Sequence, residues 1–144
     1  MEESIAPVIT TLNAPFWAAA AEGELILPWC VQTSRAFWPP SPVSPFVTGG
    51  AVTWRPASPF GVLRACVLYR RVFQRALEPV MPYGIGLVAM QAGIRLLAHV
   101  PLHPSRSAPS IGAMVEIGLR PILPGAPRVP TIIGLGTGDT AAAG

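Results

Sequence analysis

Arginine side chains gather in one short stretch of this chain, at Arg70, Arg71 and Arg75. The planar guanidinium group donates paired hydrogen bonds to phosphate and carboxylate oxygens, so the cluster predicts contact with a phosphate-bearing ligand or with acidic groups of a protein partner. Pro82 and Tyr83 follow this stretch and are expected to border it. A run of charges needs no small-molecule ligand, so two alternatives to phosphate binding stay open. The arginines form ion pairs across a protein interface, or they belong to a loop that is simply solvated.

Other residues able to do chemistry are sparse. Of the seven acidic residues, only Glu78 and Glu116 fall in the strand-rich part of the chain, and nothing sets a nucleophile beside a base. His99 and His103 flank Pro101, which excludes a helix joining them, and in an extended chain they lie about 13 Å apart. The sequence therefore predicts no catalytic residue in this chain.

Composition points to a protein partner. Charged residues make up 12% of the chain, against about 25% in ordinary soluble domains, while 51% are hydrophobic and the mean hydropathy is +0.48. Obligate interfaces are depleted in charge, so the composition predicts a permanent protein partner. With only Cys30 and Cys66, no signal peptide and no long apolar run, the chain is expected to be cytoplasmic, with reduced thiols and no membrane association.

Five segments have the residue patterns of β-strands, and these strands are expected to position the arginine site. Residues 61–70 alternate, which predicts a strand with Leu63, Ala65, Val67 and Tyr69 on one face. Residues 82–90 and 94–100 are apolar, and Gln91-Ala92-Gly93 between them predicts a hairpin turn. Two further strands are expected at 114–120 and 129–135. Cys66 is expected to be a buried, inert thiol in the first strand, and five short strands predict a small closed barrel.

The first fifty residues follow another pattern. Asn13 is expected to cap a helix that has Pro15 in its first turn, continues through residues 16–22 and ends at Gly23. So short a helix needs tertiary contacts, either with the barrel or with a partner. A strand is expected at 24–30, and the proline-rich segment 38–46 predicts an extended strut, followed by a hinge over 47–52.

The order of short motifs resembles a known family. The motifs are Phe16-Trp17, Gly23-Glu24-Leu25, Cys30, Trp38-Pro39-Pro40, Trp54, Arg70, Pro82-Tyr83, Gly93-Ile94-Arg95-Leu96 and Ile111-Gly112-Ala113-Met114-Val115. From about residue 12 to 130 they resemble the zinc-ribbon and OB-fold family of acyl-CoA-associated accessory subunits of thiolases and thiolase-like steroid side-chain aldolases. The resemblance implies an all-β chain with a short helix: an arm, helix and ribbon over residues 1–50, an OB-fold barrel over 51–133 and a flexible tail over 134–144.

The chain departs from that family at the metal site. The family ribbon holds zinc with two Cys-x-x-Cys knuckles, whereas Cys30 here is followed by Val31, Gln32 and Thr33, and no cysteine occurs in residues 40–46. A structural zinc site needs four thiolate or imidazole ligands, so no metal is predicted. The shape of the ribbon is instead expected to depend on its prolines and on aromatic residues, namely Trp29, Phe37, Trp38 and Phe46.

The resemblance implies a non-catalytic subunit that completes the substrate channel of a thiolase-like partner acting on a bulky acyl-CoA. Phe16, Trp17 and Trp38 are expected to bind the partner. Binding to coenzyme A or to the partner is expected at Arg70, Arg71, Arg75, Pro82, Tyr83 and Arg95. A free-standing acyl-CoA-binding protein is an alternative. Binding of single-stranded nucleic acid is a weaker one, because Tyr83 is the only aromatic residue in the second and third predicted strands.

Overall fold

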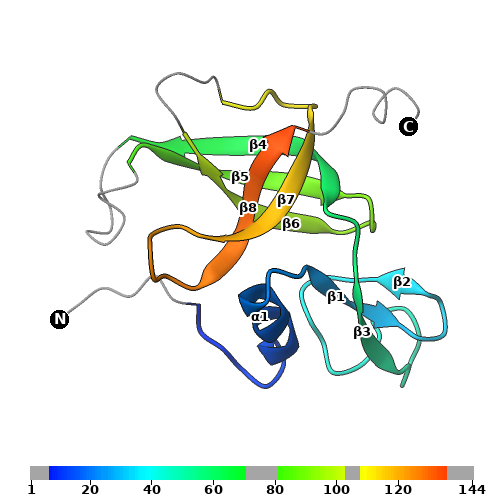
Figure 1. Ribbon diagram of the computed structural model, residues 1–144. Helices are drawn as coiled ribbons and strands as arrows, with labels where there is room; N and C mark the ends of the chain where they lie inside the picture. The colour runs from blue at the N-terminus through cyan, green and yellow to red at the C-terminus, as the bar shows by residue number, and fades with distance from the viewer. Residues whose placement is uncertain (1–6, 71–80, 103–107, 136–144) are drawn as a thin grey trace.

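The computed structural model describes residues 7–70, 81–102 and 108–135, which form one helix and two β units (Figure 1). The helix is α1 (Ala14–Ala21). The ribbon strands are β1 (Ile26–Cys30), β2 (Arg35–Ala36) and β3 (Val52–Pro56). The barrel strands are β4 (Phe60–Tyr69), β5 (Tyr83–Met90), β6 (Arg95–Pro101), β7 (Met114–Pro121) and β8 (Arg128–Leu135). The expected β-rich fold with a short helix is confirmed.

The five barrel strands close in the order β4-β5-β6-β8-β7, and β7 returns to β4. All neighbours are antiparallel except β6 and β8, which run parallel and meet at His99 and Thr131. A closed barrel of five strands with one crossover is consistent with the OB-fold. The interior is filled by buried apolar side chains, among them Leu63, Val88 and Val115.

The predicted hairpin between β5 and β6 is confirmed. The Met90 amide donates to the Ile94 carbonyl at 2.8 Å, and the Gly93 amide donates to the Met90 carbonyl at 2.9 Å. Gly93 has a φ of +95°, which glycine adopts without the steric cost that a side chain would add. Strand β6 begins at Arg95, one residue later than expected.

A β-bulge at Arg64 corrects the predicted face assignment of β4. Leu63 pairs with Val88 and Ala65 pairs with Leu87, so Arg64 is an extra residue. The extra residue reverses the alternation. Leu63 points into the core, but the expectation that Ala65, Val67 and Tyr69 share its face is wrong. Cys66 and Leu68 instead lie on the same side of the strand as Leu63, in register with Gly86 and Gly84 of β5, although Leu68 at the barrel end remains 38% exposed.

The ribbon is a separate three-stranded sheet in the order β2-β1-β3. The barrel was expected to begin at residue 51, with Trp54 entering it, but Trp54 lies in β3 and pairs with Pro28 of β1. The barrel therefore begins at Phe60. Residues 38–46 form neither helix nor strand, as their prolines predict.

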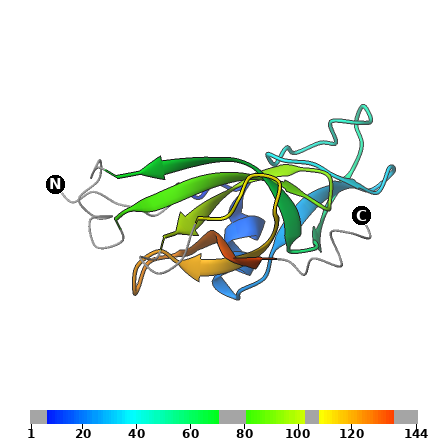
Figure 2. The same cartoon turned by 90° about the horizontal axis from the view of Figure 1, so that it is seen from above.

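Helix α1 docks on the chain's own barrel and ribbon. It packs against β1 and β8, and Phe16 (2% exposed) and Ala20 (1% exposed) belong to the core. The Asn13 side chain does not cap the helix, because its Oδ1 accepts from the Thr10 amide at 2.7 Å. In Figure 1 the helix and ribbon lie below the barrel, and Figure 2 shows β4 and β5 side by side along one long side of the molecule. Within the described residues, no helix is long and apolar enough to cross a membrane.

Candidate functional site

Three aromatic rings stack across the barrel strands at one end of the sheet. Tyr69 and Tyr83 are register partners, with ring centroids 5.2 Å apart and ring planes at 21°. The ring of His99 lies 5.5 Å from that of Tyr83. Burial, with a smaller contribution from Tyr69, raises the pKa of the Tyr83 hydroxyl, and burial lowers the pKa of His99. Both shifts favour the uncharged forms of Tyr83 and His99.

The predicted arginine site is only partly assembled. Arg70 is exposed directly after Tyr69, and Pro82 is exposed directly before Tyr83, so these residues do share one barrel end. Arg95 does not join them, because it pairs with Ala89 at the hairpin end, six residues along β6 from Pro101. Six strand residues span about 20 Å, so of the two positions that the sequence allowed for Arg95, beside the exit of the arginine loop or at the neighbouring hairpin, the structure shows the hairpin. Arg71 and Arg75 lie outside the described residues.

An outer face of the barrel joins these two ends. We define the outer face as the outward side of β4, β5 and β6, where twelve residues form four cross-strand rows. The rows are Val62–Ala89–Arg95, Ala65–Leu87–Leu97, Val67–Ile85–His99 and Tyr69–Tyr83–Pro101. Arg95 is the only charged residue of the twelve. Val67 is 56% exposed and Leu97 is 63% exposed, so this apolar side faces solvent.

The aromatic residues expected to bind a partner have mixed positions. Phe16 is buried, with ring centroids 4.9 Å from Trp17 and 4.9 Å from Trp38, so it stabilises the junction of helix and ribbon and has no surface to offer. Its assignment to a partner site is therefore wrong. Trp17 and Trp38 are half-buried around it.

Aromatic contacts also hold the ribbon, as expected. The rings of Phe37 and Phe46 pack edge to face with centroids 6.3 Å apart, and the Arg35 guanidinium lies 3.8 Å above the Phe46 ring. Arg55 lies 5.5 Å above the ring of Trp29. Cation–π and edge-to-face contacts of this kind stabilise a small sheet that has little core of its own.

The Cys30 thiol forms a hydrogen-bonded centre that the sequence analysis missed. Cys30 is fully buried, and its Sγ lies 3.7 Å from Gln32 Oε1. Burial alone would raise the pKa of this thiol, but hydrogen bonds from the Ser44 and Thr33 side chains and from the Thr33 and Gln32 backbones outweigh it and lower the pKa to about 7. Ser44 is itself buried, and its Oγ accepts from the Phe46 amide at 3.0 Å.

This centre has the residue spacing of a zinc knuckle but not its ligands. Thr33 follows Cys30 with the spacing of a Cys-x-x-Cys knuckle, and Ser41 and Ser44 repeat that spacing. One thiol with neutral hydroxyl and amide neighbours does not fit a structural zinc ion. Within the described residues, no three His, Cys, Asp or Glu side chains gather as metal ligands. The spacing of Thr33, Ser41 and Ser44 is the pattern that could have revealed the centre.

The second thiol is less protected than expected. Cys66 is half-buried and faces inward opposite Gly86, where burial raises its pKa. A raised pKa keeps the sulfur protonated and weakly nucleophilic at neutral pH. The inert role predicted for Cys66 is consistent with this environment.

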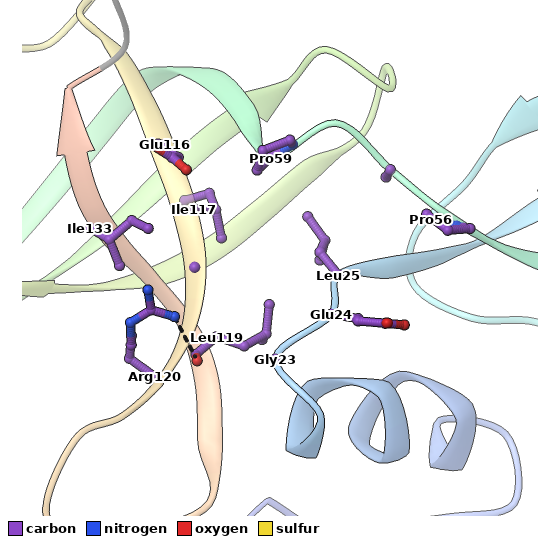
Figure 3. A pocket seen from close by; sticks show the side chains of 12 residues that line it. Gly23, Glu24, Leu25, Pro56, Pro59, Glu116, Ile117, Leu119, Arg120 and Ile133 are labelled. Carbon is purple, nitrogen blue, oxygen red and sulfur yellow. Dashed lines mark hydrogen bonds between the residues drawn. The ribbon is translucent and has the colours of Figure 1, made fainter.

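A groove of about 460 Å³ lies where the helix-to-ribbon turn meets β7 and β8 (Figure 3). Leu25, Ile117 and Ile133 give it apolar walls, and Glu24 and Glu116 bring carboxylates to it. Arg120 donates from Nη1 to the Leu119 carbonyl at 3.3 Å. The lining comes from four separate chain segments, so no single sequence pattern points to it.

Comparison with known proteins gives a likeness at the level of structure. A chain of the solved "Ltp2-ChsH2(DUF35) aldolase" superposes with a TM-score of 0.72 and 24% sequence identity. The match covers 87% of this chain and 95% of that chain. By sequence, no protein family and no curated protein matches. The likeness shows that this chain has the same fold as that chain over nearly its whole length.

Proposed function

We propose that this chain is a non-catalytic accessory subunit of a thiolase-like aldolase or thiolase. The observation that carries the proposal is the shared fold with a chain of the Ltp2-ChsH2(DUF35) aldolase, which spans almost the full length of both chains. The step from fold to role is an analogy. It agrees with the motif order of the sequence and with a charged fraction of only 12%.

The side chains of this chain support an accessory role. The Cys30 thiol is sealed from solvent, and Cys66 has a raised pKa. His99 is packed against the Tyr83 ring, where burial disfavours its protonated form. Nucleophilic and acid–base chemistry needs such groups to be open to substrate and placed within reach of one another. The partner subunit would therefore supply the catalytic residues.

The proposed substrate of the complex is a bulky acyl-CoA, such as a steroid side-chain thioester. Arg70 is exposed beside Tyr69, and Pro82 and Tyr83 lie across the same barrel end. This end would meet either the phosphates of coenzyme A or carboxylates of the partner. The accessory subunit would complete the substrate channel and hold the partner's loops in place, which lowers the entropic cost of orienting the substrate. The ribbon would act without metal.

The test is co-expression with a thiolase-like protein from the same organism. Each protein and the complex are assayed for cleavage of acyl-CoA substrates. We expect this chain to co-purify stoichiometrically with the partner, to show no turnover alone and to raise the turnover of the partner. Steady-state cleavage by the isolated chain that is lost in Cys66→Ala would contradict the proposal, and so would a partner that is equally active without this chain.

A further inference from the structure

We infer that the outer face of β4, β5 and β6 is the surface on which the thiolase-like subunit docks, and that this subunit presents an apolar patch bordered by carboxylates. The inference rests on the proposed function and assigns its interface to particular residues.

The outer face lacks the polar side chains that a solvent-facing sheet carries. Antiparallel strands with one exposed side normally alternate apolar inward and polar outward. Here both sides of β5 consist of glycine, apolar residues and Tyr83. The outward positions of β4 and β6 continue this surface, interrupted only by Arg95 and His99. Leu97 and Val67, each more than half exposed, lie in adjacent rows. An apolar patch that runs across three strands is typical of a protein interface.

The same face is ordered before any partner arrives. The Tyr69, Tyr83 and His99 rings are stacked against one another, so their side chains lose little further freedom on binding. Tyrosine and arginine are the residues most often found at the energetic centre of interfaces. The tyrosine rings contact each other through their faces, whereas a single-stranded nucleic acid needs free aromatic faces for base stacking.

The positive charges around the outer face favour an acidic binding partner. Arg64 at the bulge, Arg70 after β4 and Arg95 on β6 are all exposed, and none of the residues of β4, β5 or β6 is acidic. A second copy of this chain would bring arginine toward arginine across the contact. A partner with carboxylates around an apolar patch would pair with all three arginines. Complementary charge of this kind sets specificity and register.

The experiment measures binding of the co-expressed thiolase-like subunit to this chain by titration calorimetry. Leu97→Asp places a charge in the outer face, and Leu135→Asp is the matched control, because Leu135 is 66% exposed on β8 and lies outside the face. We expect Leu97→Asp to weaken binding at least about thirtyfold and Leu135→Asp to leave it within about threefold. Circular dichroism and melting temperature confirm that both variants fold.

A second pair of variants tests the charges. Arg70→Glu and Arg95→Glu should each weaken binding, and the loss should shrink as salt is added, since salt screens exposed ion pairs. Binding that survives Leu97→Asp overturns this inference and leaves the proposed function standing. Failure of the wild-type chain to bind the thiolase-like subunit overturns both. Two further outcomes also overturn the inference: the wild-type chain self-associates, or it binds an oligothymidylate, and Leu97→Asp abolishes that binding. Either outcome would assign the face to another occupant.

Discussion

Tyr69 and Tyr83 stack nearly face to face across β4 and β5, with centroids 5.2 Å apart and an interplanar angle of 21°. The pair sits in the last cross-strand row before the predicted Arg70 site. The bulge at Arg64 makes this stack accessible on the outer face, because with strict alternation from Leu63 the Tyr69 ring would point inward.

The first prediction is an energetic coupling between these rings. A double-mutant cycle with Tyr69→Leu and Tyr83→Leu should give a coupling of about 0.5–1.5 kcal/mol in the free energy of unfolding, measured by urea denaturation. A control cycle of Tyr69→Leu with Leu87→Ala, two rows away, should give no coupling outside error. Equal couplings in both cycles would show that the stack contributes nothing specific.

The second prediction is a loss of stability at mildly acidic pH caused by His99. Burial lowers the pKa of His99 below its ordinary value of 6.5, so in the folded state the ring resists protonation. The unfolded chain binds that proton first, and the free energy of unfolding therefore falls as pH drops below about 6.5. Melting curves from pH 8 to pH 5 should show a smaller decline for His99→Asn than for the wild type. Parallel declines in the two proteins would rule out this role.

The third prediction concerns the ionisation of Cys30. In a Cys66→Ala background, ultraviolet titration of the remaining thiol should give a midpoint near pH 7. Ser44→Ala removes a hydrogen bond to the sulfur and should move the midpoint upward, while Ser41→Ala should leave it in place. A depressed thiol pKa stabilises the folded state at higher pH, so this contribution should be lost as pH falls through 7. An unchanged midpoint in Ser44→Ala would refute the hydrogen-bonded centre.

The fourth prediction concerns metal. Elemental analysis of the purified chain should show no stoichiometric zinc, and a chelator should leave the melting temperature unchanged. The triple variant Thr33→Cys, Ser41→Cys, Ser44→Cys completes two Cys-x-x-Cys knuckles and should bind cobalt with a tetrahedral thiolate spectrum. Adding Cys30→Ala to that variant should weaken binding markedly. About one zinc per wild-type chain would be the contrary finding.

The fifth prediction separates two roles for Arg70. If its guanidinium meets a coenzyme A phosphate, Arg70→Ala removes a contact worth about 1.5–3 kcal/mol and raises the apparent KM of the complex for acyl-CoA about ten- to a hundredfold, with assembly intact. If it anchors the partner, co-purification and activity should fall together, which is the outcome we expect. Arg70→Lys keeps the charge without the planar fork and should rescue only partly. Unaltered assembly and kinetics in Arg70→Ala would leave this residue without either role.

The sequence predicts local features well where one residue type decides them. The existence of strand β4, the turn closed by Gly93 and the apolar strands β5 and β6 depend on short-range rules, and all of them are present in the structure. By contrast, no residue type or pattern in the sequence predicts the bulge at Arg64. A single extra residue nevertheless exchanged the two faces of the strand, because side chains alternate with a period of two.

The missed features are those that depend on pairing between distant segments. Trp54 belongs to the ribbon because β3 pairs with β1, more than twenty residues earlier, and the apolar pattern of β3 fits either unit equally well. The sequence left two positions open for Arg95, near the exit of the arginine loop or at the neighbouring hairpin, and the register of β5 and β6 places it at the hairpin end. The Cys30 centre is built from Thr33 and Ser44, which are too common in turns to attract notice.

The order of strand pairing also has a consequence during synthesis. The strands β4, β5 and β6 form a meander of neighbours and can pair as soon as they leave the ribosome, whereas closure needs β7 against β4 and β8 against β6. Until those two strands emerge, the nascent chain carries a sheet that is apolar on both sides. A chaperone or an already folded partner has that interval in which to shield it.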